Sequence, residues 1–290
     1  MTVAISLTVF SFVATVILLY LMLKGSRLLA ADIPNHRSLH EVATPRGGGL
    51  AFVIATVLAI GFYIVTVEEY PSAAIGLLVV ILGSAGIGWL DDHFSLSILL
   101  RLAGQVIVAV IAWFYLISPD GVVPGWHWAI IGIFAIVWSI NLVNFMDGMD
   151  GLAASQGILG AGSLAVWLYL AGGTVEAGFL AIWVAGLLGF LVFNWHPAKV
   201  FMGDAGSLSL GAVLSAVSLL AITRYDIPVL AIIIVFSPFL ADSGITLMRL
   251  PPLFTGDYPA HQGDTTIGQK RAENNNNGQN RDIVPGYCQQ

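Results

Sequence analysis

The sequence has little charge and almost no cysteine, and both shortages narrow what the protein can be. Only 10% of its 290 residues are charged, against roughly 25% in soluble domains, and 57% are hydrophobic. This composition excludes an ordinary soluble domain and indicates an integral membrane protein. The single cysteine, Cys288, excludes an internal disulfide and any metal site built from several cysteines.

The charges are gathered into short clusters between apolar runs that are long enough to cross a membrane, for which about 20 helical residues suffice. The first run is followed by Lys24 and Arg27 and has no basic segment before it, so we interpret it as an anchor and not as a cleaved signal peptide. Isolated strands could not satisfy their backbone in lipid, so we predict an all-α polytopic membrane protein. About nine transmembrane helices are expected within a membrane-embedded region, 1–250, at 3–23, 48–67, 72–90, 102–117, 126–143, 156–171, 175–193, 207–222 and 228–248.

Lysine and arginine predict the orientation of these helices. With nine spans, only Arg224 falls in the loops of one side. The positive-inside rule therefore predicts an external amino terminus. The predicted cytoplasmic side holds Lys24, Arg27, Arg37, Arg46, Arg101, Lys199 and Arg249.

Five carboxylates fall at the predicted cytoplasmic ends of the helices, in three different loops: Asp91, Asp92, Asp147, Asp150 and Asp204. They would repel one another unless a metal ion or a basic cluster neutralised them. We therefore predict a functional site at the cytoplasmic face. A transporter would instead need ionisable residues well inside its spans, away from their ends, where only Asp242 lies.

The stretch 141–151 separates two long segments without charge, 121–146 and 151–175. If the stretch is helical, its polar residues share one face: Asn141, Asn144, Asp147 and Asp150. Oxygen atoms along one ridge suit a hard cation or a phosphorylated ligand. A polar loop rich in turn-forming residues explains the stretch equally well.

Two further loops carry residues that suit a nucleotide or a phosphate. Arg37 and Arg46 lie close to the glycine run 47–49, where arginine forks and exposed amides favour phosphate. Positive-inside anchoring and tight helix packing also explain that loop. In the loop 193–207, side chains could hydrogen-bond or stack on a base, and Ser207 could cap the next helix.

Taken together, four motifs resemble the polyprenyl-phosphate N-acetylhexosamine-1-phosphate transferases of glycosyltransferase family 4. They are R-S-L-H…T-P-R-G-G-G at 37–49, L-D-D-x-F at 90–94, N-x-x-N-F-x-D-G-x-D-G at 141–151 and F-N-W-x-P-A-K-V-F-M-G-D-A-G-S at 193–207. The first motif looks closest to the O-antigen-initiating branch. The resemblance covers about residues 1–250.

The resemblance implies a multi-pass enzyme of the bacterial inner membrane with a periplasmic amino terminus. Such an enzyme transfers the sugar 1-phosphate of a UDP-linked amino sugar to undecaprenyl phosphate, releases UMP and starts a cell-envelope polysaccharide such as the O-antigen of lipopolysaccharide. UDP-GlcNAc is the default donor, a related amino sugar such as UDP-linked FucNAc or QuiNAc also fits this branch, and a muramyl-pentapeptide donor is the less favoured alternative. The implied cofactor is Mg²⁺, with Mn²⁺ as a substitute, and no nucleic acid is involved. Whether the protein forms a homodimer, and whether attack is direct or passes through a covalent intermediate, stays open.

The resemblance also implies roles for individual residues. The metal ligands would be Asp204 and Asn144. The acceptor phosphate would be handled by Asp91 and Asp92, one of them as a base. The remaining substrate-binding residues would be Asp147, Asp150, Asn194, Phe201, Lys199, Arg37 and Arg46, with the uracil at Asn194 and Phe201.

The chain departs from the family after Arg249. Where the family has a loop rich in arginine and histidine, 251–290 contains one histidine, His261, and the polar run 274–280. We predict a divergent, disordered cytoplasmic tail at 251–290. The abrupt change is also what a frame change near codon 250 would produce, so an inactive family member stays open as an alternative.

Overall fold

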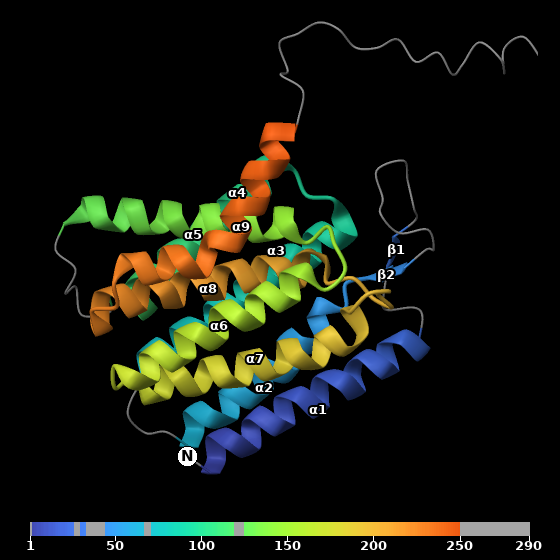
Figure 1. Ribbon diagram of the computed structural model, residues 1–290, viewed down its shortest axis with the longest axis horizontal. Helices are drawn as coiled ribbons and strands as arrows, with labels where there is room; N and C mark the ends of the chain where they lie inside the picture. The colour runs from blue at the N-terminus through green and yellow to red at the C-terminus, as the bar shows by residue number, and fades with distance from the viewer. Residues whose placement is uncertain (1, 26–29, 33–43, 67–70, 119–124, 250–290) are drawn as a thin grey trace, which may run out of the picture. The chain divides into compact units, whose positions relative to one another are not determined.

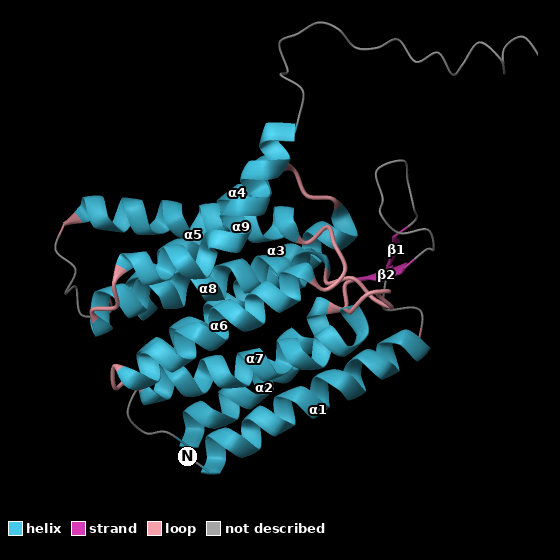
Figure 2. Ribbon diagram, viewed as in Figure 1, coloured by secondary structure: helices cyan, strands magenta, loops and turns pink. Residues whose placement is uncertain are grey.

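The computed structural model describes residues 2–25, 30–32, 44–66, 71–118 and 125–249, which form nine long helices and one small sheet (Figures 1 and 2). The elements are α1 (Thr2–Lys24), β1 (Ala30–Asp32), β2 (Thr44–Arg46), α2 (Gly49–Thr66), α3 (Pro71–Phe94), α4 (Ile98–Ala112) with the π-helical turn η1 (Trp113–Ile117), α5 (Trp126–Met146), α6 (Leu152–Leu170), α7 (Thr174–Asn194), α8 (Gly203–Tyr225) and α9 (Val229–Arg249). By its internal contacts the chain separates into Met1–Leu247, which holds the helical array, and Met248–Gln290. The predicted tail, 251–290, lies outside the described residues, and its disorder stays a prediction.

The predicted all-α membrane protein is confirmed. Within the part of the chain that the structure describes, eight helices are long and apolar enough to cross a membrane, and α9 adds a shorter apolar segment, Val229–Ile245. Pro238 lies inside α9, where its ring removes one backbone donor.

Two helix ends differ from the prediction in ways that matter for the site. The helix α3 continues to Phe94, so Asp91 and Asp92 lie in its last turn and not in a loop. The helix α8 begins at Gly203, which makes the predicted capping role of Ser207 wrong. Ser207 instead bonds back to the Gly203 carbonyl, 3.2 Å away, from the second turn.

The helix α8 forms the centre of the array. Every residue from 203 to 218 is buried, and the helix packs against α3, α5, α2 and α6. Its many glycine, alanine and serine residues let neighbouring backbones approach closely, as is usual in membrane bundles. At Gly211, an added Cβ would lie only 2.7 Å from the Ile140 Cα of α5. This packing fixes the amino-terminal turn of α8, and with it Asp204.

The loop before α2 is joined to the loop before α8 by backbone hydrogen bonds. The Phe201 amide donates to the Pro45 carbonyl at 2.8 Å, and the Gly49 amide donates to the Met202 carbonyl at 2.8 Å. Gly203 has a φ of +72°, which favours glycine, and an added Cβ there would lie 2.9 Å from the Gly47 Cα. The glycine run after Arg46 therefore serves close backbone contact, and it brings Arg46 to the start of α8.

Candidate active site

One arginine and two aspartates from three separate elements meet at the amino-terminal end of α8. The Arg46 Nη2 atom lies 2.5 Å from Asp204 Oδ1 and 3.1 Å from Asp92 Oδ1. The close approach of α3 to α8 depends on Gly88, because a Cβ at that position would collide with the backbone of Asp204. The predicted convergence of Asp92 and Asp204 is thus present, and Arg46 supplies a positive charge between them.

The two carboxylate oxygens of Asp92 have different surroundings. Oδ2 accepts a hydrogen bond from the Ala205 amide at 3.3 Å, in the first turn of α8, where the helix dipole favours an anion. Oδ1 is buried and accepts no hydrogen bond within the described part of the chain. Its charged partner is Arg46, whose Nη2 atom lies 3.1 Å away, so a cation that displaced this guanidinium would meet an oxygen without a hydrogen bond.

Asp91, the neighbour of Asp92, is held in a different way. Its Oδ2 pairs with Arg101 Nη1 at 2.7 Å, and its Oδ1 accepts from the Leu96 amide at 2.9 Å. Both contacts stabilise the turn between α3 and α4. The Asp91 carboxyl also interacts with that of Asp204, so all three acids belong to one cluster. Arg101 is a site residue that the sequence reasoning missed, although an opposite charge ten residues further on was a usable signal.

Asn144 and Asp147 reach the same cluster from the end of α5. The Asn144 Oδ1 atom accepts from the Ser207 hydroxyl at 2.9 Å, and Asp147 is the half-buried residue that ends the helix. Burial raises the pKa of Asp147 well above its ordinary value. Arg46 opposes this rise, whereas Asp204 adds to it. The Arg46 pKa is itself raised, because the attraction of Asp204 and Asp92 outweighs the opposing effect of burial.

The stretch 141–151 is not one helix, so the expected single polar ridge is absent. The helix α5 ends at Met146, and α6 begins only at Leu152, after Gly151 with a φ of +69°. Asn141 donates to Gln105 of α4 at 2.7 Å. Asp150 accepts from the Ala198 amide at 3.0 Å and pairs with His196 at 2.9 Å, in the loop before α8.

The residues expected at a uracil lie in that same loop. Asn194 is buried, its Oδ1 accepts from the Gly151 amide at 3.0 Å, and its Nδ2 donates to the Val200 carbonyl at 2.9 Å. Both ends of its amide are thus engaged in joining two loops. Phe201 is half-buried beside Arg46, with which it forms a single parallel bridge. Lys199 is exposed, and Arg37 lies outside the described residues.

The donor atoms of this cluster fit a magnesium ion that relies on its substrate for further ligands. Within the described ranges, no three histidine, cysteine, aspartate or glutamate side chains form a metal-binding group. Mg²⁺ commonly binds through one or two carboxylates and completes its shell with water and substrate phosphates. The carboxylates of Asp204 and Asp92 and the Asn144 amide oxygen are such ligands, and the buried Asp92 Oδ1 still lacks a hydrogen bond.

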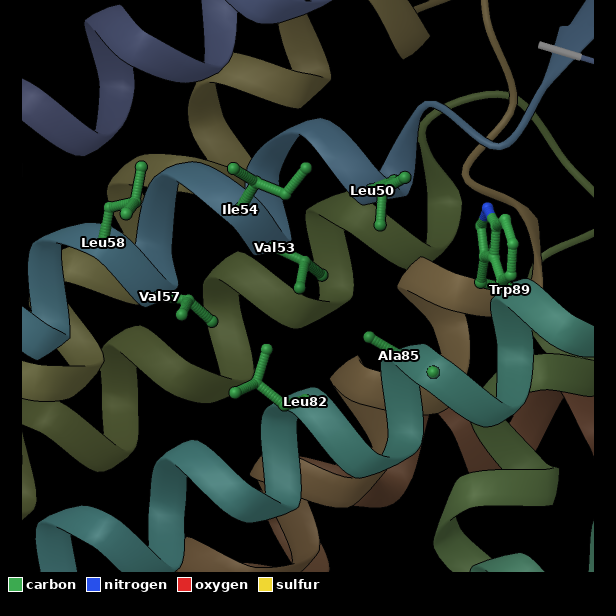
Figure 3. A pocket seen from close by; sticks show the side chains of 9 residues that line it. Leu50, Val53, Ile54, Val57, Leu58, Leu82, Ala85 and Trp89 are labelled. Atoms are coloured by element: carbon green, nitrogen blue, oxygen red, sulfur yellow. The ribbon is translucent and has the colours of Figure 1, made fainter. Parts of the chain in front are cut away.

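Two apolar grooves lie between helices of the array. The larger, of about 350 Å³, lies between α2 and α3 (Figure 3). It ends at Trp89, three residues before Asp92, and at Leu50, next to Gly49. The smaller, of about 210 Å³, is lined by Trp138, Asn141, Leu142 and Phe145 of α5 and Ser243 of α9.

Comparison with known proteins identifies the family. Residues 74–222 match the model of glycosyl transferase family 4. A probable undecaprenyl-phosphate N-acetylglucosaminyl 1-phosphate transferase of Bacillus subtilis is 35% identical in an alignment of 207 positions, which covers 67% of this chain and 56% of that protein. Phospho-N-acetylmuramoyl-pentapeptide-transferases of Oceanobacillus iheyensis and Halalkalibacterium halodurans are 36% and 32% identical, over 62% and 73% of this chain and the same shares of their own length. The chain therefore belongs to glycosyl transferase family 4.

These matches cover only part of the relatives and only part of the candidate site. The match spans less than two thirds of the length of the first two relatives. The matched region 74–222 contains Asp92, Asn144, Asp147 and Asp204 but not Arg46, which precedes it.

Proposed function

We propose that the protein transfers an N-acetylhexosamine 1-phosphate from a UDP-linked sugar to undecaprenyl phosphate and releases UMP. The observation that carries this proposal is the cluster of Asp92, Asp147, Asp204 and Arg46 at one end of a membrane-spanning helical array. A charged site there can receive a water-soluble diphosphate, and the adjoining apolar grooves suit the chain of a lipid phosphate. The product would start a cell-envelope polysaccharide, and the R-S-L-H and P-R-G-G-G strings favour O-antigen.

The donor sugar we propose first is GlcNAc, which the name of the Bacillus subtilis relative supports. Several other relatives are phospho-N-acetylmuramoyl-pentapeptide-transferases, and they favour a muramyl-pentapeptide donor as the second candidate. The two donors share the uridine diphosphate that the charged cluster would bind. They differ beyond the diphosphate, in the sugar and in the pentapeptide that the muramyl donor carries.

The acceptor needs little activation by the protein, because a phosphate monoester already carries a nucleophilic oxygen near neutral pH. Its oxygen attacks the phosphorus that carries the sugar, and the bond from that phosphorus to UMP breaks. When bound, Mg²⁺ neutralises the diphosphate and the leaving UMP. Asp204 and Asn144 would hold the ion together with Asp92, and the Ala205 amide in the first turn of α8 faces the same region.

Asp92 is better placed than Asp91 to act on the acceptor phosphate. Asp91 uses both of its oxygens to hold Arg101 and the Leu96 amide. Asp92 keeps one buried oxygen without a hydrogen bond in the described structure. We assign to Asp92 the positioning of the acceptor phosphate through the bound ion, and to Asp91 the support of the turn. Asn194 would likewise support the nucleotide pocket by joining its two loops.

The test is an assay with the purified full chain, Mg²⁺ and undecaprenyl phosphate. UDP-GlcNAc and UDP-N-acetylmuramyl-pentapeptide are supplied in separate reactions, and both UMP and the lipid product are measured by mass spectrometry. UMP release with UDP-GlcNAc that depends on the acceptor supports the proposal. Release only with the muramyl donor selects the second candidate, and no release with either contradicts the activity and favours the inactive family member.

A further inference from the structure

Arg46 occupies the position between two buried carboxylates that a bridging divalent ion would need. Its Nη2 atom contacts Asp204 at 2.5 Å and Asp92 at 3.1 Å. Asp147 adds a third acid to this electrostatic group, so three carboxylates face one guanidinium and leave a formal charge of −2 when all are ionised. The neighbouring Asp91 is already paired with Arg101. The position therefore attracts cations, and Arg46 competes for it.

We propose that Arg46 is a built-in counter-ion that substitutes for the metal ion when no substrate is bound and turns to the diphosphate when metal and donor bind together. This inference rests on the proposed function for the identity of the diphosphate. Its central claim concerns competition between Arg46 and a divalent cation, and it holds whichever sugar is transferred.

The structure separates a fixed part of Arg46 from a movable part. Its backbone is held by the bridge to Phe201 and by strand β2, which pairs with β1. Its side chain is 43% exposed, whereas the side chains of Asp92 and Asp204 are 9% and 12% exposed. The guanidinium can thus swing toward solvent on a long flexible stem, while the acids stay in place. The partner that leaves when a metal ion arrives is Arg46.

The displaced guanidinium can bind the diphosphate of the donor. A metal ion and an arginine repel each other when both bridge the same two carboxylates, because like charges at contact distance are unfavourable. A diphosphate bound to the metal brings negative charge to the same place, and arginine binds phosphate oxygens through two parallel hydrogen bonds. Arg46 should therefore weaken metal binding in the absence of the donor and strengthen donor binding once metal is present. Metal and donor would bind cooperatively.

Manganese binding to the full chain in detergent tests this directly, with free Mn²⁺ measured by electron paramagnetic resonance. Without substrate, Arg46→Gln should bind Mn²⁺ at least about tenfold more tightly than the wild type, since one adjacent positive charge is removed. Arg46→Lys should fall between the two. In the wild type UDP-GlcNAc or UDP-N-acetylmuramyl-pentapeptide should tighten Mn²⁺ binding, and this coupling should be largely lost in Arg46→Gln.

Arg101→Gln is the matched control, because it removes an arginine that pairs with the neighbouring Asp91 and not with Asp92 or Asp204. It should change Mn²⁺ affinity less than Arg46→Gln does. Should Arg46→Gln unfold without metal, its melting temperature in a Mn²⁺ titration gives the same affinity. Unchanged or weaker Mn²⁺ binding by Arg46→Gln, or an equal gain in Arg101→Gln, would overturn the proposal. Tighter binding by Arg46→Gln in a protein that releases no UMP would leave this inference standing and contradict only the proposed activity.

Discussion

Asp204 combines three features at one residue. It is buried, it lies in the first turn of α8, and its carboxylate meets both Arg46 and the acids of α3. The amino-terminal turn of a helix stabilises a negative charge, which helps to explain how an acid is tolerated here. The same features make Asp204 the residue whose charge the site can least lose.

Asp204→Asn keeps the shape of the side chain and removes its charge. We expect turnover to fall at least about 10²–10³-fold, because a lost metal ligand removes several kcal/mol of transition-state stabilisation. UMP release at matched expression measures this. The control is Asp226→Asn, the same change at the exposed opposite end of α8, which should keep most of the activity. Near-wild-type turnover by Asp204→Asn would remove this residue from the metal site.

The raised pKa of Asp147 predicts how the stability of the protein depends on pH. Its pKa in the folded protein lies above the ordinary carboxyl value of about 4, so ionising it opposes folding. This loss of stability is absent below the unfolded pKa, grows as pH rises through the folded pKa, and is complete above it. In metal-free protein, Asp147→Asn should therefore raise the melting temperature at pH 8, by about 2–4 °C per kcal/mol, and raise it less at pH 5.

Asp150→Asn is the control for this measurement, since Asp150 accepts hydrogen bonds from its neighbours and its removal should not stabilise the fold. A gain for Asp147→Asn that is the same at pH 5 and pH 8 would show that its charge is not the cause. Adding Mg²⁺ should shrink the gain, because the ion favours the charged form of the wild type.

At the scale of elements, the site depends on how closely α3 approaches α8. Gly88 lies against the backbone of Asp204, so a single added methyl group must push the two helices apart. That movement would separate Asp92 from Arg46 and from the Ala205 amide. Gly86, half a turn earlier on α3, has open space beside it.

Gly88→Ala should therefore reduce kcat by about 10-fold or more and lower the melting temperature, whereas Gly86→Ala should change neither. Both variants carry the same substitution on the same helix, so helix propensity is matched. Steady-state UMP release and thermal unfolding in detergent are the measurements. Equal effects of the two changes would show that the close contact at Gly88 is unimportant.

The groove between α2 and α3 is a candidate path for the acceptor chain (Figure 3). Gly86 lines this groove and has open space at the position of an added Cβ. Gly86→Leu should therefore fill part of the groove and raise the KM for undecaprenyl phosphate about tenfold, which corresponds to about 1.4 kcal/mol of lost binding. Gly61→Leu, at another open glycine, serves as the control. The KM for the UDP-sugar should stay the same in both. If Leu142→Trp raised the acceptor KM and Gly86→Leu did not, the chain would follow the groove between α5 and α9 instead.

At the scale of the whole molecule, lysine and arginine are divided unequally between the two ends of α8. Arg46, Arg101 and Lys199 lie at the end that holds the acids, and Arg224 lies in the last turn of α8. The positive-inside rule then predicts that the end with more basic residues, and with it the acidic site, faces the cytoplasm. There it would have access to UDP-sugars.

Cysteine labelling in intact cells checks this orientation in a background where Cys288 is replaced by serine. A cysteine at Val122 should react with a membrane-impermeant maleimide from outside, and one at Ser95, an exposed residue after α3, only after permeabilisation. The reverse pattern would overturn both the topology and the cytoplasmic site. Labelling of neither position in permeabilised cells would point to burial, and a second position in each loop would then be needed.

The sequence by itself determined the parts of this protein that a membrane imposes. A helix that crosses lipid needs about 20 predominantly apolar residues, so the runs of hydrophobic residues predicted the number and approximate ends of the helices, and the acids near the ends of the runs predicted which end holds the site. The resemblance to the family motifs predicted a role for each of those acids. The prediction could go this far because each of these signals is local in the chain.

Only the tertiary structure decided which of these groups meet. Arg46 and Asp204 are 158 residues apart, and their pairing depends on backbone contacts at glycines that could equally have served ordinary helix packing. The end of α5 at Met146 and the burial of the Asn194 amide had the same origin, since both depend on neighbours distant in the sequence. A single sequence contains each residue but not the distances between them, and the chemistry of the site depends on those distances.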